Sequence, residues 1–366
     1  MRMDLYRSCF SGRSRSLLAS LSLLAVCYLL LLFPAYQKRR DVRRDYSMWT
    51  GSIAQLHNKS QRIVSSRCKS NFSRSKLSKL YPGKPLGSIP VFVGRGSSAL
   101  FGGRTYGPPF GFRGCEEQLQ EAAELLPQSS GGIPEELVPS GCKRCIVVGN
   151  GGILAGSRLG PFIDRHSIVI RLNNGPVSDH SRDVGTKTTL RIMYPEGAIK
   201  LPQEYDPDSL LVVAPFKCTD LTWLKAMVRK EPLSLWQKLW FWQSVPELIP
   251  LEPHNYRILN LDIIKETAII YLGFPEPTYI WWRWNQAIPT LGMTSVITAL
   301  LLCDEVNLAG FGYDMHQPNL PLHYYEAIGM DAMNSQAVHN VNREKLFLAS
   351  LVKGNVVNDL TGGISW

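Results

Sequence analysis

The segment CKRCIVVGNGG, residues 142–152, constrains the fold more than any other part of this 366-residue chain. Residues 145–148 (CIVV) are apolar at every position and lead into a glycine-rich turn that contains Asn150. A strand without polar positions suits a parallel sheet that helices cover on both faces. Ligands of such sheets bind at the carboxyl ends of the strands. The segment therefore predicts a buried strand whose following loop faces a binding cleft.

Strand and helix patterns alternate along the rest of the chain. Apolar and β-branched runs predict strands, and longer stretches with helical periodicity predict helices between them. Alternation of this kind predicts one α/β domain with a Rossmann-like, doubly wound and mostly parallel sheet. The further expected strands are 167–172, 188–193, 209–214, 256–259 and 305–309, and the expected helices are 116–126, 221–229, 262–272, 292–302 and 340–353.

An uncharged apolar segment near the N-terminus, residues 16–36, is long enough to cross a bilayer. A cleavable signal peptide has a shorter apolar core and a small-x-small cleavage site, which residues 29–33 do not offer. The sequence therefore predicts an uncleaved signal anchor behind a tail of residues 1–15. Basic residues flank the span on both sides, so the positive-inside rule leaves its orientation open.

Sequons and cysteines indicate that the chain after the span lies in a lumenal, oxidising compartment. Asn58 and Asn71 each begin an N-glycosylation sequon. Six cysteines follow the span, an even number that complete disulfide pairing allows. Residues 37–87 are rich in Arg, Lys and Ser, which predicts a flexible stem before a globular domain over residues 88–366. The expected arrangement is a single-pass type II membrane protein.

The net charge of +10 at pH 7 does not indicate a nucleic-acid-binding protein. Residues 1–87 hold 17 Lys and Arg against 3 Asp, a charge of +14, which leaves −4 for residues 88–366. A nucleic-acid-binding protein would carry its basic surface on the folded domain. The basic residues instead fit a solvated linker beside an anionic membrane surface.

Three local patterns point to other chemistries. Cys142-x-x-Cys145 matches a redox dithiol or half a zinc site, but the chain has no second C-x-x-C or H-x3–5-H pair for zinc. The dinucleotide fingerprint G-x-G-x-x-G is incomplete, because Leu154 occupies the third glycine position. Asp206-Pro207-Asp208 matches a metal-binding Asp-x-Asp pair, but it precedes an expected strand instead of following one.

Four ordered segments carry a family resemblance. They are CKRCIVVGNGG…IVIRLNNGPV…DVGTKTTLRIMYPE, PTLGMTSVITALLLCDEVNLAGFGYD, HYYE and HNVNREKLF. They resemble the large, small, third and very-small sialyl motifs of the eukaryotic sialyltransferases, glycosyltransferase family 29, and cover most of residues 142–350. Within that family they are most similar to the β-galactoside α-2,3 branch. The resemblance implies a GT-A-like variant of the Rossmann-like fold in a Golgi type II membrane protein whose catalytic domain, residues 88–366, is lumenal.

The resemblance implies an inverting transfer of sialic acid from CMP-sialic acid to the 3-hydroxyl of a terminal β-galactose. The expected acceptors are Galβ1-3/4GlcNAc ends of glycoproteins and glycolipids. Lactosylceramide is the alternative acceptor, because the branch that sialylates it shares NNGPV and HNV. A non-catalytic nucleotide- or sugar-binding membrane protein is a rival, and the intact set of Asn150, Asn173, His323 and His339 argues against it.

The resemblance also implies the site residues. His339 matches the catalytic base, and a pKa near 6.5 suits a histidine for removing the galactose proton. His323 matches a histidine that stabilises the departing CMP, and no metal or other cofactor is implied. Asn150 and Asn173 could instead each cap a turn. Glu344, five residues after His339, is expected to have a structural role. The donor is expected to contact Asn150, Asn173, Tyr194, Asn260, Thr290, Gly292 and Gly312.

Cysteine pairs and two tryptophan clusters complete the expectations. The resemblance implies one disulfide between Cys145 and Cys303 and another between Cys68 and Cys142. Cys115 and Cys218 depart from the family pattern, and they either pair with each other or stay free.

Tryptophans within residues 236–242 and 281–284 suit the rim of an acceptor site, because aromatic faces stack on galactose. Core packing and a mobile lid are alternatives for both clusters.

Overall fold

The computed structural model describes residues 53–84, 86–87, 89–95, 105–128, 132–138, 140–277, 287–312, 320–335 and 338–364. The predicted tail, the predicted membrane span and the first part of the predicted stem lie outside these ranges, as does the tryptophan cluster 281–284. Within the described ranges, no helix has the length and apolar character needed to cross a bilayer.

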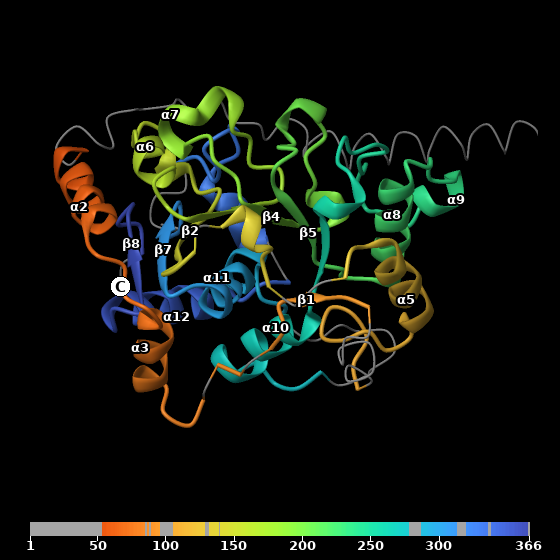
Figure 1. The fold of residues 1–366 in the computed structure, drawn as a ribbon, viewed down its shortest axis with the longest axis horizontal. Coiled ribbons are helices and arrows are strands. Elements are labelled where there is room, and N and C mark those ends of the chain that lie inside the picture. The colour runs from red at the N-terminus through yellow and green to blue at the C-terminus, as the bar shows by residue number, and fades with distance from the viewer. Residues whose placement is uncertain are drawn as a thin grey trace, which may run out of the picture.

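Among the described residues, eight strands form one sheet in the order β1-β6-β5-β4-β3-β2-β7-β8 (Figure 1). Neighbouring strands run parallel except at one edge, where β1 pairs with β6 in the antiparallel sense. The predicted mostly parallel α/β sheet is confirmed. The strands are β1 (Phe92–Val93), β2 (Arg144–Val148), β3 (Ile168–Leu172), β4 (Leu190–Met193), β5 (Leu210–Val213), β6 (Tyr256–Leu259), β7 (Glu305–Ala309) and β8 (Val357–Asp359).

Helices fill the connections between the strands. The α-helices are α2 (Ile53–Ser65), α3 (Phe72–Leu80), α5 (Glu116–Leu125), α6 (Gly160–Ile163), α7 (Ser181–Val184), α8 (Cys218–Arg229), α9 (Leu235–Lys238), α10 (Leu261–Glu266), α11 (Leu291–Leu302) and α12 (Val341–Lys353). A π-helical turn, η8 (Thr267–Tyr271), continues α10. Short 3-10 turns are η2 (Glu135–Leu137), η3 (Gly152–Leu154), η4 (Ser178–His180), η5 (Pro195–Gly197), η6 (Pro202–Glu204), η7 (Pro253–Asn255) and η9 (Met330–Ser335).

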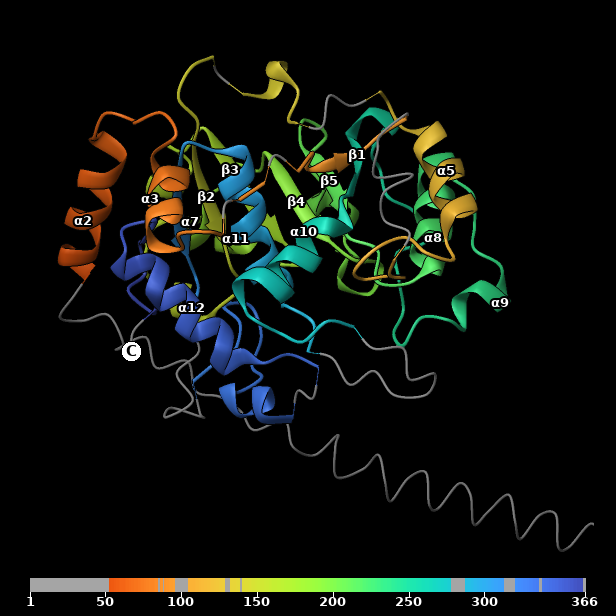
Figure 2. The ribbon, with the colours of Figure 1, turned by 90° about the horizontal axis from the view of Figure 1, so that it is seen from below.

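Helices cover both faces of the sheet, as Figures 1 and 2 show. Along β2, Cys145 and Val147 pack into the core that contains α11, α10 and α12. Ile146 and Val148 point the other way, into a second core with α2, α6 and α7. Because successive side chains of a strand alternate between faces, a strand buried on both faces is apolar throughout.

The structure differs from the predicted flexible stem over residues 53–80, where α2 and α3 pack against the body beside β8 and β7 (Figure 1). Leu56 on α2 and Leu77 on α3 are buried. Cys68, between the two helices, is bonded to Cys142 just before β2. Two buried leucines and a covalent bond therefore order a segment whose basic composition favours disorder.

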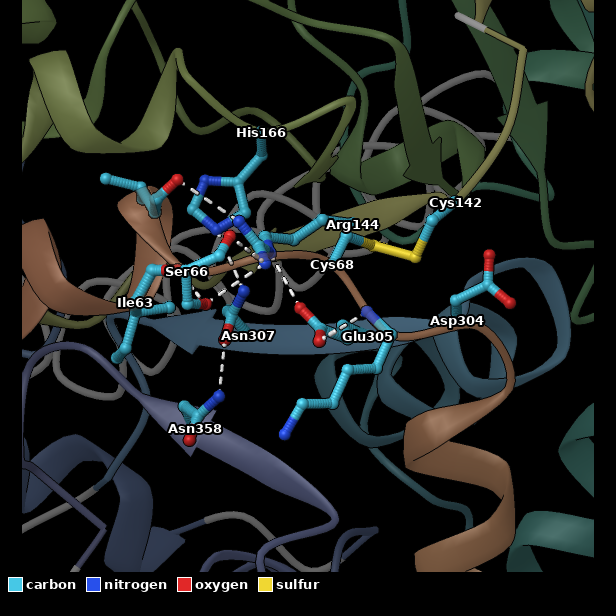
Figure 3. Close-up of polar contacts among 12 residues, drawn as sticks. Ile63, Ser66, Cys68, Cys142, Arg144, His166, Asp304, Glu305, Asn307 and Asn358 are labelled. Carbon is cyan, nitrogen blue, oxygen red and sulfur yellow. Dashed lines mark hydrogen bonds and ion pairs between the residues drawn. A yellow bond between two sulfur atoms is a disulfide. The ribbon is translucent and has the colours of Figure 1, made fainter.

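A polar network holds the same segment against β2 and β7 (Figure 3). Arg144 on β2 forms an ion pair with Glu305 on β7 at 2.7 Å. The Arg144 guanidinium also donates to the backbone carbonyls of Val64 and Ser66, at 3.1 and 2.9 Å. The backbone N–H of Lys69 donates to the other oxygen of Glu305 at 2.8 Å. One buried arginine thus joins two central strands to the loop between α2 and α3.

Three disulfides link the described cysteines. They are Cys68–Cys142, Cys115–Cys218 and Cys145–Cys303. The first and third pairs are those that the family resemblance implies, and both are confirmed. The second resolves the alternative left open for Cys115 and Cys218, and it joins the start of α5 to the start of α8.

Candidate active site

The strand order reverses between β2 and β7, and the candidate site lies at this point. Strands β3 to β6 follow β2 on one side, whereas β7 and β8 lie on the other. Loops that leave neighbouring strands in opposite directions open a crevice at the carboxyl ends of the sheet. A cavity of about 560 Å³ occupies this place. Its lining includes Gly149, Asn150, Asn173, Tyr194, Glu196, Lys217, Trp242, Thr290, Gly292, Gly312, His323, His339 and Glu344.

The glycines after β2 allow two loops to pack backbone against backbone. A Cβ atom at Gly149 or Gly151 would lie 2.5 or 2.6 Å from the carbonyl oxygen of Gly310, which follows β7. The N–H of Gly151 donates to that same oxygen at 3.0 Å. A Cβ at Gly152 would lie 2.1 Å from the carbonyl oxygen of Pro321. The glycines therefore position the loop with Asn150 by close backbone packing.

Asn150, which follows β2, contacts the end of β3 and the segment that contains Tyr324. Its side-chain Nδ2 donates to the carbonyl of Leu172, at the end of β3, at 3.3 Å. Its own carbonyl accepts from the N–H of Tyr324, in the predicted third motif, at 3.0 Å. The side-chain Oδ1 of Asn150 lies close to Gly175. A Cβ atom added at Gly175 would be 2.4 Å from this oxygen. Asn150 is thus fixed at the floor of the cavity.

Asn173 ends β3 in the left-handed conformation, with φ of 47°. Its side-chain Oδ1 is buried and has no hydrogen-bond partner among the described residues. Its main-chain carbonyl accepts from Nη1 of Arg191 on β4 at 2.9 Å, and so does the carbonyl of Gly175. A buried acceptor without a partner is costly unless a ligand supplies a donor. Asn173 therefore has the features of a ligand-binding residue, held in place by a buried arginine.

The start of α11 faces the cavity and is held by a carboxylate from another helix. Thr290 caps α11, because its Oγ1 accepts from the N–H of Met293 at 3.1 Å. Glu344 on α12 accepts from both the N–H and the hydroxyl of Thr290, at 2.7 and 2.5 Å. Burial raises the pKa of Glu344 to about 7, although the two hydrogen bonds from Thr290 oppose this shift. The first turn of a 12-residue helix is a favourable place for an anion such as a phosphate.

Glu344→Gln is expected to change how protein stability depends on pH. A folded-state pKa of about 7, raised from 4.5, means that the protonated carboxyl stabilises the fold below pH 4.5 and that this stabilisation is lost as the pH rises through 7. The free energy of unfolding of the wild type should therefore fall relative to Glu344→Gln by up to about 3 kcal/mol between pH 5 and pH 8. Urea unfolding at both pH values measures the difference. Glu117→Gln, at an exposed position on α5, is the control and should show no such change. Parallel curves for wild type and Glu344→Gln would contradict the shift.

His339 lies just before α12 with one ring nitrogen already engaged. Its Nδ1 is 2.7 Å from the carbonyl oxygen of Ile288, and a carbonyl can only accept, so Nδ1 carries the proton. Nε2 of the neutral ring is then an unprotonated acceptor. Burial lowers the pKa of His339, and the bond to Ile288 only partly opposes this. The neutral, proton-accepting form is thus favoured at a residue that lines the cavity.

His323 reaches the cavity from the segment after residue 320. Its backbone forms a bridge with Gly151, which brings the predicted third motif against the first glycine turn. Its Nδ1 is paired with the carboxylate of Glu326. Its ring stacks on Tyr325, with centroids 5.4 Å apart and planes at 10°. Glu326 can balance a doubly protonated ring, which would then donate a hydrogen bond from Nε2.

A lysine that the sequence analysis did not single out also lines the cavity. Lys217 follows β5 and forms ion pairs with Glu196 and Asp220, both at 2.7 Å. Burial raises the pKa of Asp220 to about 6, although Lys217 opposes this shift. Lys217 also lies over the ring of Phe241, 4.7 Å from its centroid. The sequence does carry a signal for this position. Ligands bind at the carboxyl ends of parallel strands, and Lys217 follows the expected strand 209–214.

Asn260 is the one predicted donor residue that does not line the cavity. Its Oδ1 accepts from the N–H of Asp262 and caps α10, while its Nδ2 donates to the carbonyl of Pro90 beside β1. The side chain is buried between an edge strand and a helix start, so both of its polar atoms are already engaged. The expected role of Asn260 in donor binding stays a prediction. Asp206 and Asp208 also lie away from the cavity, before β5, as the sequence indicates.

The cavity combines a helix start that suits a phosphate, an unpartnered amide oxygen and a neutral histidine. These features suit a transferase that acts on a nucleotide-activated donor. The sequence profile described as glycosyltransferase family 29 (sialyltransferase) matches residues 96–356. The chain belongs to this family.

Relatives and one solved structure agree with this assignment. The chain is 44% identical to lactosylceramide alpha-2,3-sialyltransferase of Rattus norvegicus over 312 residues, which cover 85% of this chain and 80% of the relative. It is 43% identical to CMP-N-acetylneuraminate-beta-1,4-galactoside alpha-2,3-sialyltransferase of Mus musculus over 313 residues, which cover 85% and 81%. A crystal structure of a mammalian sialyltransferase in complex with Gal-beta-1-3GalNAc-ortho-nitrophenol matches with a TM-score of 0.59 at 25% identity, covering 81% of this chain and 98% of that one.

The protein is thus an α-2,3-sialyltransferase that transfers sialic acid from CMP-sialic acid to galactosides. Enzymes of this family act without a metal ion. The part of the chain that the structure describes contains no group of three or more His, Cys, Asp or Glu side chains that could hold one.

Proposed function

We infer that this enzyme transfers sialic acid to the 3-hydroxyl of the terminal galactose of lactosylceramide. The observation that carries the inference is the 44% identity to a lactosylceramide alpha-2,3-sialyltransferase over 85% of the chain. The Galβ1-3/4GlcNAc acceptor expected from the motifs becomes the second candidate. It is favoured by the 43% identity to a beta-1,4-galactoside alpha-2,3-sialyltransferase.

CMP-sialic acid lies across the carboxyl ends of β2 and β3 in this proposal. The unpartnered Oδ1 of Asn173 accepts a hydrogen bond from the donor, and Asn150 supports it from the neighbouring loop. Thr290 and Gly292 place the start of α11 beside the phosphate. Tyr194 and Gly312 complete the lining. Arg191 acts through the loop of Asn173, and its buried positive charge favours an anionic donor above it.

His339 is the general base of the proposed reaction. Its Nε2 takes the proton of the galactose 3-hydroxyl while that oxygen forms a bond to the anomeric carbon of sialic acid. On the opposite side of the anomeric carbon, the bond to the CMP phosphate oxygen breaks, and its electron pair stays on the phosphate. One displacement of this kind inverts the configuration and forms no covalent enzyme intermediate. The bond from Nδ1 to Ile288 holds the ring in the required tautomer.

His323 stabilises the CMP leaving group. A doubly protonated His323, balanced by Glu326, donates from Nε2 to the phosphate oxygen on which charge develops. The N–H groups at the start of α11 offer further positive charge at the same cavity. Lys217 is directed into its ion pairs with Glu196 and Asp220, so it shapes the cavity wall rather than neutralising the phosphate.

The proposal places the enzyme in the Golgi membrane as a type II protein with a lumenal catalytic domain. Residues 16–36 would be the anchor, and Asn58 and Asn71 would carry glycans. Both asparagines are exposed, whereas the sequon residues Ser60 and Ser73 are buried. Oligosaccharide addition would therefore have to precede the packing of α2 and α3.

An acceptor comparison tests the proposed function. The full-length enzyme, in detergent micelles with EDTA, is given CMP-sialic acid and either lactosylceramide, Galβ1-4GlcNAc, Galβ1-3GlcNAc or Galβ1-3GalNAc. We expect α-2,3-linked product from every galactoside that reacts and a kcat/KM for lactosylceramide at least about tenfold above the others, which is about 1.4 kcal/mol of transition-state binding. Galβ1-4GlcNAc as the best acceptor would replace the first candidate by the second. Binding of CMP without transfer to any acceptor would favour the non-catalytic rival.

A further inference from the structure

A group of large apolar side chains beside the cavity is largely exposed to solvent in the described structure. We call it the α9 aromatic surface, and it is formed by Leu235, Trp236, Leu239, Trp240 and Trp242. Each side chain is between 70 and 79% exposed. Large exposed clusters of this kind are uncommon on soluble proteins, and they mark interaction sites. The core-packing alternative for this tryptophan cluster is therefore wrong for all of its members except Phe241, which is buried.

The segment that carries the α9 aromatic surface is fixed to the enzyme body. Ser234 caps α9, and its Oγ accepts from the N–H of Gln237. The buried ring of Phe241 lies under Lys217 at the cavity. Gln243 donates from Nε2 to the carbonyl of Glu196, and Trp223 donates to the carbonyl of Pro246 at 2.9 Å. The outward-pointing tryptophans are thus held on an anchored support, which argues against a mobile lid.

The charge around the α9 aromatic surface indicates what kind of partner fits it. Lys238 is the only charged residue between Glu231 and Glu247, and it is paired with Glu247 at 2.7 Å. A surface with paired charge and no basic cluster offers little attraction to an acidic protein or a nucleic acid. Three tryptophans and two leucines are instead the residues that insert at the boundary between lipid headgroups and acyl chains. Trp indoles suit that boundary because their rings are apolar and their N–H groups remain hydrated.

The α9 aromatic surface lies next to the cavity in which the proposed reaction takes place. Trp242 belongs both to the α9 aromatic surface and to the lining of the cavity. α9 lies at the periphery of the ribbon, on the side away from α12 (Figures 1 and 2). The predicted membrane span ends at residue 36 and α2 begins at Ile53. The chain between them, even fully extended, reaches at most about 60 Å, so the body stays close to the bilayer.

We propose that the α9 aromatic surface docks on the lipid bilayer that holds the acceptor and presents the cavity to glycolipid headgroups. This inference rests on the proposed function, because it explains how the enzyme would reach an acceptor galactose that is attached to a membrane lipid. Docking converts a search in three dimensions into a search along the membrane plane. It raises the effective concentration of a membrane-bound acceptor without adding any contact to its sugar. A soluble sugar acceptor gains nothing from the same surface.

Fluorescence quenching tests the contact with lipid directly. The full-length enzyme is reconstituted in phosphatidylcholine vesicles with and without bromine on the acyl chains. Bromine quenches nearby indoles, and we expect the brominated vesicles to quench the wild type. The quenched signal should fall at least twofold in Trp236→Phe/Trp240→Phe, which keeps the surface apolar and removes two fluorophores. Quenching that is unchanged in this variant would overturn the proposal, because it would arise from tryptophans elsewhere in the chain.

An activity comparison tests the consequence for the acceptor. In Trp236→Glu/Trp240→Glu, we expect kcat/KM for lactosylceramide in the same vesicles to fall about tenfold, while kcat/KM for water-soluble lactose stays within twofold. Leu346→Glu is the matched control, since Leu346 is 58% exposed on α12, and both acceptors should react as in the wild type. Equal losses on both acceptors would overturn docking, because the surface would then act through the cavity itself.

Failure of the proposed function gives a different pattern. If wild type acts on soluble N-acetyllactosamine but on lactosylceramide neither in micelles nor in vesicles, the acceptor assignment fails while the quenching result still decides the lipid contact. A second copy of the chain is the other possible occupant of the surface. Cross-linking of wild type into dimers that Trp236→Glu/Trp240→Glu abolishes, together with absent quenching, would replace the bilayer by that copy.

Discussion

His339→Ala is expected to lower kcat for sialyl transfer by a factor of about 1,000. A positioned general base contributes roughly 100- to 10,000-fold, and alanine leaves only water to accept the galactose proton. His339 lines the cavity, its Nδ1 is committed to the carbonyl of Ile288, and its Nε2 is left to accept. Initial-rate assays with saturating CMP-sialic acid and lactosylceramide measure the loss. His254→Ala, at an exposed position in η7, is the matched control and should keep wild-type kcat.

The pH profile separates loss of a base from loss of structure. Because burial lowers the pKa of His339, the neutral base persists to a pH below the usual 6.5. Wild-type kcat/KM should therefore hold as the pH falls to 6.5 and decline only below it, with the acid limb absent in His339→Ala. CMP binding should remain within threefold of wild type in the variant. Full activity of His339→Ala at any pH would contradict the role of base, and lost CMP binding would indicate a structural role instead.

Loss of the Cys145–Cys303 disulfide is expected to destabilise the enzyme by about 5 kcal/mol. The bond closes a loop of 158 sequence positions, and the chain-entropy model assigns a cost of this size to opening such a loop in the unfolded state. It joins the central strand β2 to the end of α11, and both sulfurs are buried. Urea unfolding of Cys145→Ala/Cys303→Ala, compared with the wild type in the same detergent, gives the difference in free energy.

The Cys68–Cys142 bond offers an internal comparison for that measurement. It closes a shorter loop of 74 positions at the edge of the body, so Cys68→Ala/Cys142→Ala should cost somewhat less, about 4.5 kcal/mol in the same model. The double variant at Cys145 and Cys303 should therefore unfold at the lower urea concentration. A change below about 1 kcal/mol in both variants would mean that residual structure in the unfolded state already confines these loops.

The sheet could be predicted because its strands are buried on both faces. Each expected strand is present with ends within two residues of the expected ones, since short, largely apolar and β-branched runs leave little choice of boundary. β1 and β8 are only two and three residues long, too short for a periodic pattern. α2 and α3 could not be predicted from local composition. Their order depends on the contacts of Cys68 and Arg144, which come from residues far along the chain.

The site could be predicted as a set of residues but not as a set of contacts. The motifs indicated Asn150, Asn173, His323 and His339, and the structure brings all four to one cavity. Asn260 caps α10 in the structure, because a polar residue after a strand serves equally well as a helix cap, and the sequence does not distinguish the two. The bond between Glu344 and Thr290 joins positions 54 residues apart, and no local pattern connects them.

If residues 16–36 anchor the enzyme, as proposed above, the attachment of the segment around Cys68 decides how it could be released from the membrane. A protease that cuts before Ile53 would free a body with α2, α3 and every described disulfide intact. A cut between residues 69 and 141 would leave both pieces joined through Cys68–Cys142, so the enzyme would stay tethered despite a broken backbone. Soluble enzyme can therefore arise by cleavage before Cys68, whereas nicks between residues 69 and 141 release nothing until the Cys68–Cys142 disulfide is reduced.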